Sequence, residues 1–374
     1  MQCFDTRPRG PRTYEQAARR LAVSLAVALV VILAGVPPAS AQAVIKVNED
    51  VNIRLGVLGQ FQGDWLEDGE TGDTPNLFIR RIRLLFGGQV AKNVSFFVDT
   101  DAPNLGRKVG STKNITPSMI IQDAYAEFRV NTGLMINAGL MFVPFSRASV
   151  QSAGTLLALD YPPYTFAQSP ATQSATGRDT GFQARGYFLG NRLEYRVGAF
   201  QGAQRANLDP ALRVTGRLQY QFLEPEGTGY FYAGTQFGMR RVLALGAAFD
   251  VQDEYRGYDV DLYLDHPTGT GAITGQVFYN HFDGGLTLPS LPAQDLVQLE
   301  LGYFFPGPRL TPWVQFARRD AEGPLALDET RWSVGVNYWL QRHNANVKAA
   351  FGQIDSDGLG ARSQFTIQLQ IFYF

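Results

Sequence analysis

Arginine is the residue type whose placement in this sequence could carry chemistry. Nine arginines fall on the polar side of segments in which every second side chain is apolar. They are Arg54, Arg81, Arg83, Arg129, Arg185, Arg192, Arg196, Arg213 and Arg217. A guanidinium keeps its charge and offers five donors in a planar fork, so it suits phosphate or carboxylate groups. The pattern predicts a basic track that binds small anions.

Acidic residues on the same predicted face leave a second interpretation open. They are Asp99, Asp101, Asp123, Glu127, Asp179 and Glu194. Pairing with these carboxylates would make the arginines part of a mixed-charge wall rather than an anion site. The residues alone favour neither interpretation.

Other chemistry-bearing residues are sparse. The three histidines are not spaced as metal ligands; they are His266, His281 and His343. No G-x-S-x-G, H-E-x-x-H or G-x4-G-K motif is present. Asp265 beside His266 could be written as an acid–base pair, but the His266-Pro267 step is typical of a turn. We therefore expect no catalytic residue, no metal site and no cofactor.

The elements that would position the arginines are strands. Between residues 52 and 373 the sequence shows sixteen segments of alternating apolar and polar residues. Seven shorter connections alternate with eight longer polar ones, among which we count residues 252–257 and 354–362 as long and residues 223–238 as short-side. This arrangement is typical of bacterial outer-membrane barrels, whose short turns face the periplasm. The predicted fold class is all-β, a 16-stranded antiparallel transmembrane β-barrel.

A soluble secreted β-sandwich, acting as an enzyme or a binding protein, is the competing fold. Sixteen strands exceed what one sandwich usually holds, and charged residues avoid the apolar face in most segments. Arg80 and Arg318 are exceptions that we expect at the outer ends of lipid-facing strands, where long side chains reach the headgroups. Phe78 is expected to face lipid, whereas Phe372 and Phe374 share the polar face without an explanation.

The connection over residues 143–178 is longer than a loop without a function would need to be. Four prolines stiffen it, and its leucines and aromatic residues need a surface to pack on. We expect it to fold into the barrel mouth, where Arg147, Asp160 and Arg178 are the charged candidates for a constriction. The alternative is a surface loop that caps a neighbouring subunit.

The first 43 residues have the layout of a secretory signal peptide. Five arginines precede an apolar run over residues 21–36, and small residues follow at Ala39, Ala41 and Ala43. We expect cleavage after Ala41 or Ala43; a retained membrane anchor is the alternative, although the run is shorter than the roughly 20 residues that a spanning helix needs.

Removal of residues 1–43 takes five of the 33 basic and two of the 34 acidic residues and leaves a net charge of −4 on the domain 44–374. That domain has no cysteine, because Cys3 lies in the signal. The absence of a basic excess argues against a nucleic-acid partner.

Three stretches resemble a known family. Residues 78–101 (FIRRIRLLFGGQVAKNVSFFVDTD), 141–146 (MFVPFS) and 177–186 (GRDTGFQARG) are similar to the phosphate-selective porin O and P family. The resemblance implies a sixteen-stranded outer-membrane porin, commonly a homotrimer, with an inward loop and an arginine ladder. Phosphate-specific members have lysines near the constriction, whereas this chain has none between Lys113 and Lys348; Lys46 and Lys92 lie near strand ends.

The expected function is passive diffusion of small solutes across the bacterial outer membrane through a water-filled channel. A barrel of this size leaves an aqueous lumen whose inward residues set selectivity, and arginines there favour anions. The expected partners are outer-membrane lipid and small anions or small polar solutes. A non-conducting barrel with an adhesion or structural role stays open as an alternative.

Overall fold

The computed structural model describes residues 43–67, 74–110, 112–204, 211–323 and 327–374. The predicted signal peptide, residues 1–43, lies outside the described residues except for Ala43, where the first strand begins. The strands are β1 (Ala43–Lys46), β2 (Asn52–Leu66), β3 (Thr74–Ala91), β4 (Val94–Asp101), β5 (Lys108–Val109), β6 (Thr112–Lys113), β7 (Ile120–Asn131), β8 (Leu134–Phe142), β9 (Arg178–Phe188), β10 (Leu193–Phe200), β11 (Arg213–Gln221), β12 (Val242–Gln252), β13 (Tyr255–Pro267), β14 (Ala272–Asp283), β15 (Gln294–Phe304), β16 (Leu310–Ala321), β17 (Glu329–Trp339), β18 (Ala345–Ser356) and β19 (Gly360–Tyr373). One 3₁₀ turn, η1, spans Ala148–Val150. In the described part of the chain no helix is long and apolar enough to cross a membrane.

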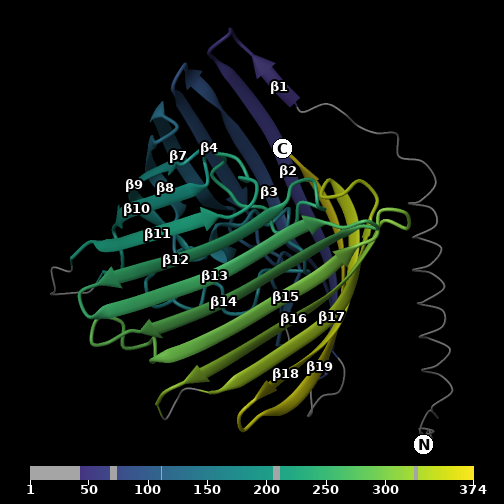
Figure 1. The fold of residues 1–374 in the computed structure, drawn as a ribbon. Coiled ribbons are helices and arrows are strands. Elements are labelled where there is room, and N and C mark those ends of the chain that lie inside the picture. The colour runs from purple at the N-terminus through teal and green to yellow at the C-terminus, as the bar shows by residue number, and fades with distance from the viewer. Residues whose placement is uncertain (1–42, 68–73, 111, 205–210, 324–326) are drawn as a thin grey trace, which may run out of the picture. The chain divides into compact units, whose positions relative to one another are not determined.

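Sixteen of these strands form one closed antiparallel ring (Figure 1). Each strand from β2 to β4 and from β7 to β19 pairs with the next, and β19 returns to β2 with Ile367 opposite Gly63. Closure removes the free edges of the sheet, and β1 pairs with residues 52–55 of β2, which extend beyond β19. The predicted 16-stranded antiparallel barrel is confirmed.

The apolar side of the strands forms the outer surface. Ile53, Leu84 and Val334 have exposed fractions of 36%, 43% and 46%. On the opposite side of the wall Arg196 and Asp250 are completely shielded from solvent. A sandwich would bury the apolar side between two sheets, so the soluble β-sandwich alternative is wrong.

A bulge in β3 corrects two predicted positions. Gln60 pairs with Arg81 and Phe61 with Ile79, so Arg80 is the extra residue and the strand changes phase at this point. Phe78 consequently faces inward and is buried, rather than facing lipid. Arg80 turns to an inward carboxylate, Asp160, instead of reaching for headgroups.

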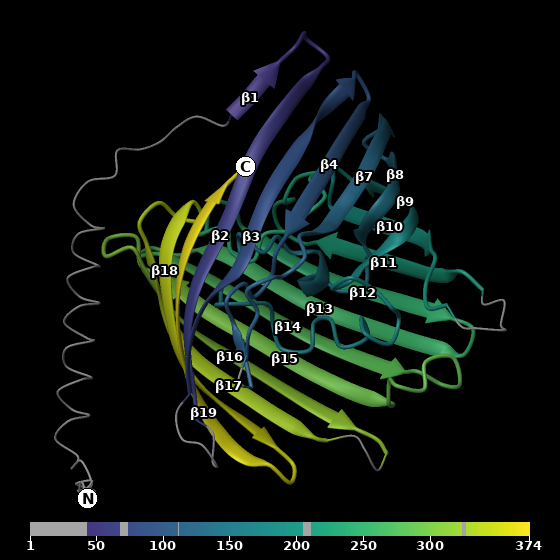
Figure 2. The same ribbon diagram turned by 180° about the vertical axis from the view of Figure 1, so that it is seen from behind.

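The connections differ from the predicted lengths in three places. Strand pairing continues further than expected at β12–β13 and β18–β19, so residues 253–254 and 357–359 are tight turns rather than long loops. The connection between β11 and β12, residues 222–241, is the larger surprise. We call it segment 222–241, and we call residues 143–177 loop 143–177. Both run inside the ring of strands (Figure 2).

Candidate functional site in the barrel lumen

Loop 143–177 crosses the lumen and hydrogen-bonds to the opposite wall. The Gln60 and Gln370 side-chain amides donate to the carbonyls of Ala153 (3.3 Å) and Gly154 (2.9 Å). Further along, Asn337 donates to the Leu157 carbonyl at 2.6 Å, and the Lys348 ammonium bridges the carbonyls of Leu156 and Ala158 at 2.8 and 2.7 Å. Strands β2, β17, β18 and β19 therefore hold the loop across the channel axis.

Segment 222–241 meets the loop inside the barrel. The Tyr232 carbonyl accepts from the Ser152 amide at 3.0 Å, and its own amide donates to the Val150 carbonyl at 3.2 Å. A third bond runs from the Thr235 amide to the Thr155 carbonyl at 3.2 Å. The backbones come so close at Gly234 that a Cβ there would lie 2.8 Å from the Leu156 Cα. The two connections form one inner structure.

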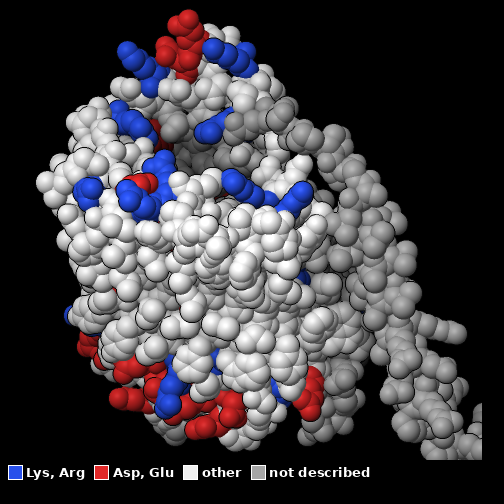
Figure 3. Space-filling model, turned by 45° about the vertical axis from the view of Figure 1, so that its right-hand side comes forward, with Lys and Arg blue, Asp and Glu red and all other residues white. Residues whose placement is uncertain are grey.

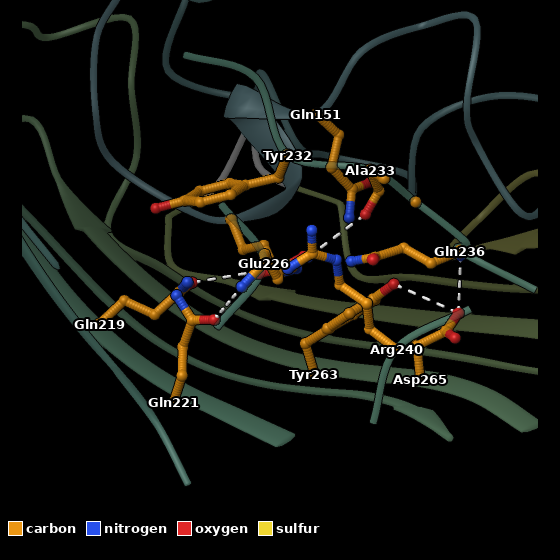
Figure 4. Close-up of polar contacts among 12 residues, drawn as sticks. Gln151, Gln219, Gln221, Glu226, Tyr232, Ala233, Gln236, Arg240, Tyr263 and Asp265 are labelled. Atoms are coloured by element: carbon orange, nitrogen blue, oxygen red, sulfur yellow. Dashed lines mark hydrogen bonds and ion pairs between the residues drawn. The ribbon is translucent and has the colours of Figure 1, made fainter. Parts of the chain in front are cut away.

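Arg147 ties this inner structure together. Its guanidinium holds both Glu226 oxygens at 2.6 and 2.7 Å and lies between the rings of Tyr232 and Tyr263, at 4.7 and 3.6 Å from their centres. Figure 4 shows Glu226 among Gln219, Gln221 and Gln236. The Gln221 side-chain oxygen accepts from the Glu226 amide (2.6 Å), and the Gln236 side chain donates to Glu226 (2.7 Å). Bidentate pairing with aromatic faces on both sides is the geometry that arginine fits and lysine does not.

Most of the predicted arginine track is buried and paired with carboxylates. The pairs are Arg81 with Asp160 (2.6 Å), Arg83 with Asp99 (3.1 Å) and Asp101 (3.0 Å), Arg185 with Glu127 (2.6 Å), Arg196 with Glu194 (2.7 Å), Arg213 with Asp250 (2.5 Å), and Arg217 with Asp259 (3.2 Å) and Asp261 (2.6 Å). Arg178, a predicted loop candidate outside the track, pairs in the same way with Asp123 (3.0 Å). This is the mixed-charge arrangement that the sequence left open. The arginines carry their charge, but a carboxylate already occupies each fork.

Three members of the track remain accessible. Arg54 and Arg129 lie near the end of the barrel that holds the chain termini, and Arg192 lies in the β9–β10 turn. Arg192 donates to the Phe222 carbonyl at 2.8 Å, where segment 222–241 begins. Sequence periodicity grouped these three with the buried arginines because it shows on which face of a strand a side chain lies. It does not show how deep in the barrel the side chain lies or what covers it.

Asp160 is the predicted loop residue that reaches an open surface. Arg80 and Arg81 contact its two oxygens at 2.8 and 2.6 Å. Burial alone would raise the pKa of Asp160, but the two guanidinium groups outweigh it and hold that pKa well below its ordinary value. Arg147 and Arg178, the other two candidates, are buried, and Arg178 is the first residue of β9 rather than part of the loop.

One side of the lumen is apolar, which explains why Phe372 of β19 and the following Phe374 lie inward. The Phe374 ring lies 5.5 Å from Phe97, and Phe231 of segment 222–241 lies 5.3 Å from the same ring. Phe372 packs against Gly154 so closely that a Cβ there would clash with its ring at 2.6 Å. A cavity of about 50 Å³ remains beside these rings. The end of the last strand thus packs against loop 143–177 and segment 222–241.

The inner structure separates two mouths. On the side of the long connections lies a cavity of about 440 Å³. Its lining has charged residues (Asp64, Arg80, Arg107, Asp160 and Arg331), amides and hydroxyls (Gln62, Asn104, Gln315, Ser333, Gln353, Gln364 and Thr366) and apolar side chains such as Phe78, Trp313 and Trp332. On the side of the termini a second cavity of about 560 Å³ includes Arg54 and Arg129 in its wall. Among the described residues no group of three or more His, Cys, Asp or Glu could hold a metal ion.

Sequence reasoning missed segment 222–241. The alternation of connections places it on the short-turn side despite its length, and nothing in a period of two marks it as internal. The available signal was composition, because a solvated turn has no need for the aromatic run Tyr230, Phe231 and Tyr232 beside Glu226. The aromatic residues are buried or half-buried in the lumen.

A closed barrel with an apolar outer wall and a charged inner wall defines a protein of the outer-membrane porin class. The chain belongs to the phosphate-selective porin O and P family, whose pattern matches residues 51–261. No curated protein matches the chain significantly. The family and the barrel make it an outer-membrane channel protein, as the sequence predicts.

Solved structures share the fold at low sequence identity. The anion-selective porin from Comamonas acidovorans is 12% identical, with a TM-score of 0.60 over 86% of this chain and 100% of that one. The outer membrane channel DcaP of Acinetobacter baumannii is 12% identical, with a TM-score of 0.57 over 88% and 99%. Salmonella typhi OmpF in complex with daunomycin is 12% identical, with a TM-score of 0.58 over 88% and 100%.

Proposed function

We propose that the chain is a channel for passive diffusion of small polar solutes, narrowed by loop 143–177 and segment 222–241. The observation that carries the proposal is the position of these two connections between two polar mouths of about 440 and 560 Å³. The outer mouth combines uncharged amides and hydroxyls with charges of both signs and with apolar side chains. Such a surface replaces the hydration of sugars or zwitterions without trapping either.

A modest anion preference is part of the proposal, and it rests on Arg54 and Arg129. The buried arginines contribute to the field of the lumen, but their carboxylate partners cancel most of it at a distance. Reversal potential across a planar bilayer in a salt gradient tests the preference. We expect weak anion selectivity that falls when both residues become glutamine; cation selectivity in the wild type would contradict it.

A non-conducting barrel is the second candidate, because the inner structure is well packed. The apolar rings around Phe97 and the bonds between loop 143–177 and segment 222–241 would suit a plug. Swelling of liposomes in uncharged sugars separates the two functions. Swelling supports the channel, whereas its absence in vesicles that contain folded barrel supports the plug.

Cleavage of the signal peptide, residues 1–43, and a homotrimer complete the proposal. Family membership supports the trimer, and the arginine-flanked apolar run supports cleavage after Ala41 or Ala43. Amino-terminal sequencing of protein from outer membranes tests the cleavage. Native mass spectrometry in detergent tests the trimer, and a single mass equal to one chain would contradict it.

A further inference from the structure

The cavity near the chain termini has a wall that β1 completes. β1 pairs with residues 52–55 of β2, the part of β2 that extends beyond its pairing with β19, which covers residues 57–66. This pairing sets Val44 opposite Arg54 and Lys46 opposite Asn52. The β3–β4 turn supplies Lys92, and β7 supplies Arg129. The cavity holds about 560 Å³, within the range of small-molecule sites.

Positive charge dominates this wall. Lys46, Arg54, Lys92 and Arg129 line the cavity, and Glu127 is the carboxylate among its lining residues. Glu127 is already engaged, because Arg185 contacts one of its oxygens at 2.6 Å while Arg129 contacts the other at only 3.5 Å. Within the described ranges, no ion pair joins Lys46, Arg54 or Lys92 to a carboxylate. The cavity lining therefore carries a net positive charge.

The distribution of charge over the molecule reinforces this local excess. Figure 3 shows mainly basic side chains, with one group of acidic ones between them, near the end that carries β1, and a concentration of acidic side chains at the opposite end. The acidic residues near β1 include Glu49 and Asp50 of the β1–β2 turn, which are exposed and are not among the residues that line the cavity. Exposed carboxylates at that opposite end are Glu67, Asp253, Glu254, Asp283, Glu322, Asp355 and Asp357. An anion near the termini is drawn toward the basic cavity and away from the acidic rim, at a range set by ionic strength.

The cavity lining also contains apolar and neutral polar groups, which an inorganic anion does not need for binding. Val44 and Val94 contribute apolar surface, and Asn52 and Ser95 contribute neutral polar groups. Several separated cations around a cavity of this volume fit an anion with charges at more than one position and a carbon skeleton between them.

We propose that this cavity binds a small organic polycarboxylate at the inner mouth of the barrel. The proposed function bears on the inference only through orientation, since the termini then face the periplasm. Signal cleavage after Ala43 would add a further cation, because the new ammonium would then be on Val44, which lines the cavity. The sequence placed Lys46 and Lys92 merely near strand ends, and the structure brings them together.

Citrate binding to the mature barrel in detergent tests the proposal by titration calorimetry at low ionic strength. We expect binding that weakens about tenfold or more in the Lys46→Gln/Lys92→Gln double variant, since each lost charge removes a direct interaction. The matched control is Lys108→Gln/Lys113→Gln, which makes the same chemical change on β5 and β6 at the other end and should shift affinity less than about twofold.

Three results would overturn the inference. They are an absence of citrate binding, equal weakening in both double variants, and affinity for inorganic pyrophosphate equal to that for citrate. Circular dichroism establishes that each variant is folded. Because binding is measured without a membrane, a barrel that binds citrate but does not conduct contradicts only the proposed function, and a conducting barrel that ignores citrate contradicts only this inference.

Discussion

Arginine side chains inside this barrel act chiefly through partners that the wall itself supplies. Arg213 and Asp250 are both fully shielded, and two hydrogen bonds of 2.7 and 2.5 Å join them. A third donor of Arg213 contacts the Ser174 hydroxyl in loop 143–177 at 2.7 Å. Desolvation makes such a pair costly to form, but breaking it is costlier, because one charge is left alone.

Replacing Arg213 by glutamine is therefore expected to lower the free energy of unfolding by about 3–5 kcal/mol. Urea titration of the barrel in lipid vesicles measures the change. Arg241→Gln is the control, because the Arg241–Glu224 pair is exposed and screened by water, so its loss should leave stability nearly unchanged. Adding Asp250→Asn to Arg213→Gln should restore most of the loss. A single variant as stable as the wild type would contradict the role of this pair.

His343, in the β17–β18 turn, gives the docking of segment 222–241 a pH dependence. Its Nε2 donates to the Thr235 carbonyl at 3.0 Å, and the Phe237 ring lies 4.7 Å away. Burial lowers the pKa of His343 to about 3, whereas the unfolded side chain has a pKa of about 6.5. The neutral ring stabilises the docked segment above about pH 6.5, and this contribution declines as pH falls toward the folded pKa.

We predict that His343→Gln loses less stability than the wild type between pH 7.5 and pH 4.5. Glutamine can still donate to the Thr235 carbonyl but cannot acquire a proton. Carboxylates titrate equally in both proteins, so the difference between their urea midpoints isolates the histidine. Equal losses would show that His343 is not held neutral.

At the scale of elements, segment 222–241 depends on close backbone packing against loop 143–177. Gly234→Ala places a methyl group within 2.8 Å of the Leu156 Cα and the Thr155 carbonyl oxygen, which backbone atoms cannot avoid. Gly229→Ala is the matched control, because its Cβ meets nothing nearer than 3.9 Å. We expect Gly234→Ala to displace the segment and to increase single-channel conductance, with Gly229→Ala unchanged. Unaltered conductance in Gly234→Ala would mean that the segment does not narrow the channel.

The strands were predictable from sequence because the two faces of a barrel wall contact different media. Lipid and lumen impose a period of two, which identified sixteen segments and the lumen side of Arg196 and Arg217. The bulge at Arg80 was not predictable, since one extra residue reverses the phase without altering composition. Depth was not predictable either, because the cover over Arg213 comes from connections that follow no period.

At the scale of the whole molecule, the barrel wall separates lipid from the lumen. Substitutions at adjacent residues of one strand can test which side faces which. Val334, at the centre of β17, faces outward, while its neighbour Ser333 lines the outer mouth. A lysine on the lipid side at mid-bilayer costs about 2–4 kcal/mol, whereas a lysine in the lumen keeps its hydration. We predict that Val334→Lys lowers stability in vesicles by that amount and that Ser333→Lys costs less than about 1 kcal/mol. Equal costs, measured by urea unfolding, would contradict the assignment of the two faces. The same pair adds a test of the channel, because a lysine at Ser333 is expected to raise anion selectivity while one at Val334 leaves it unchanged.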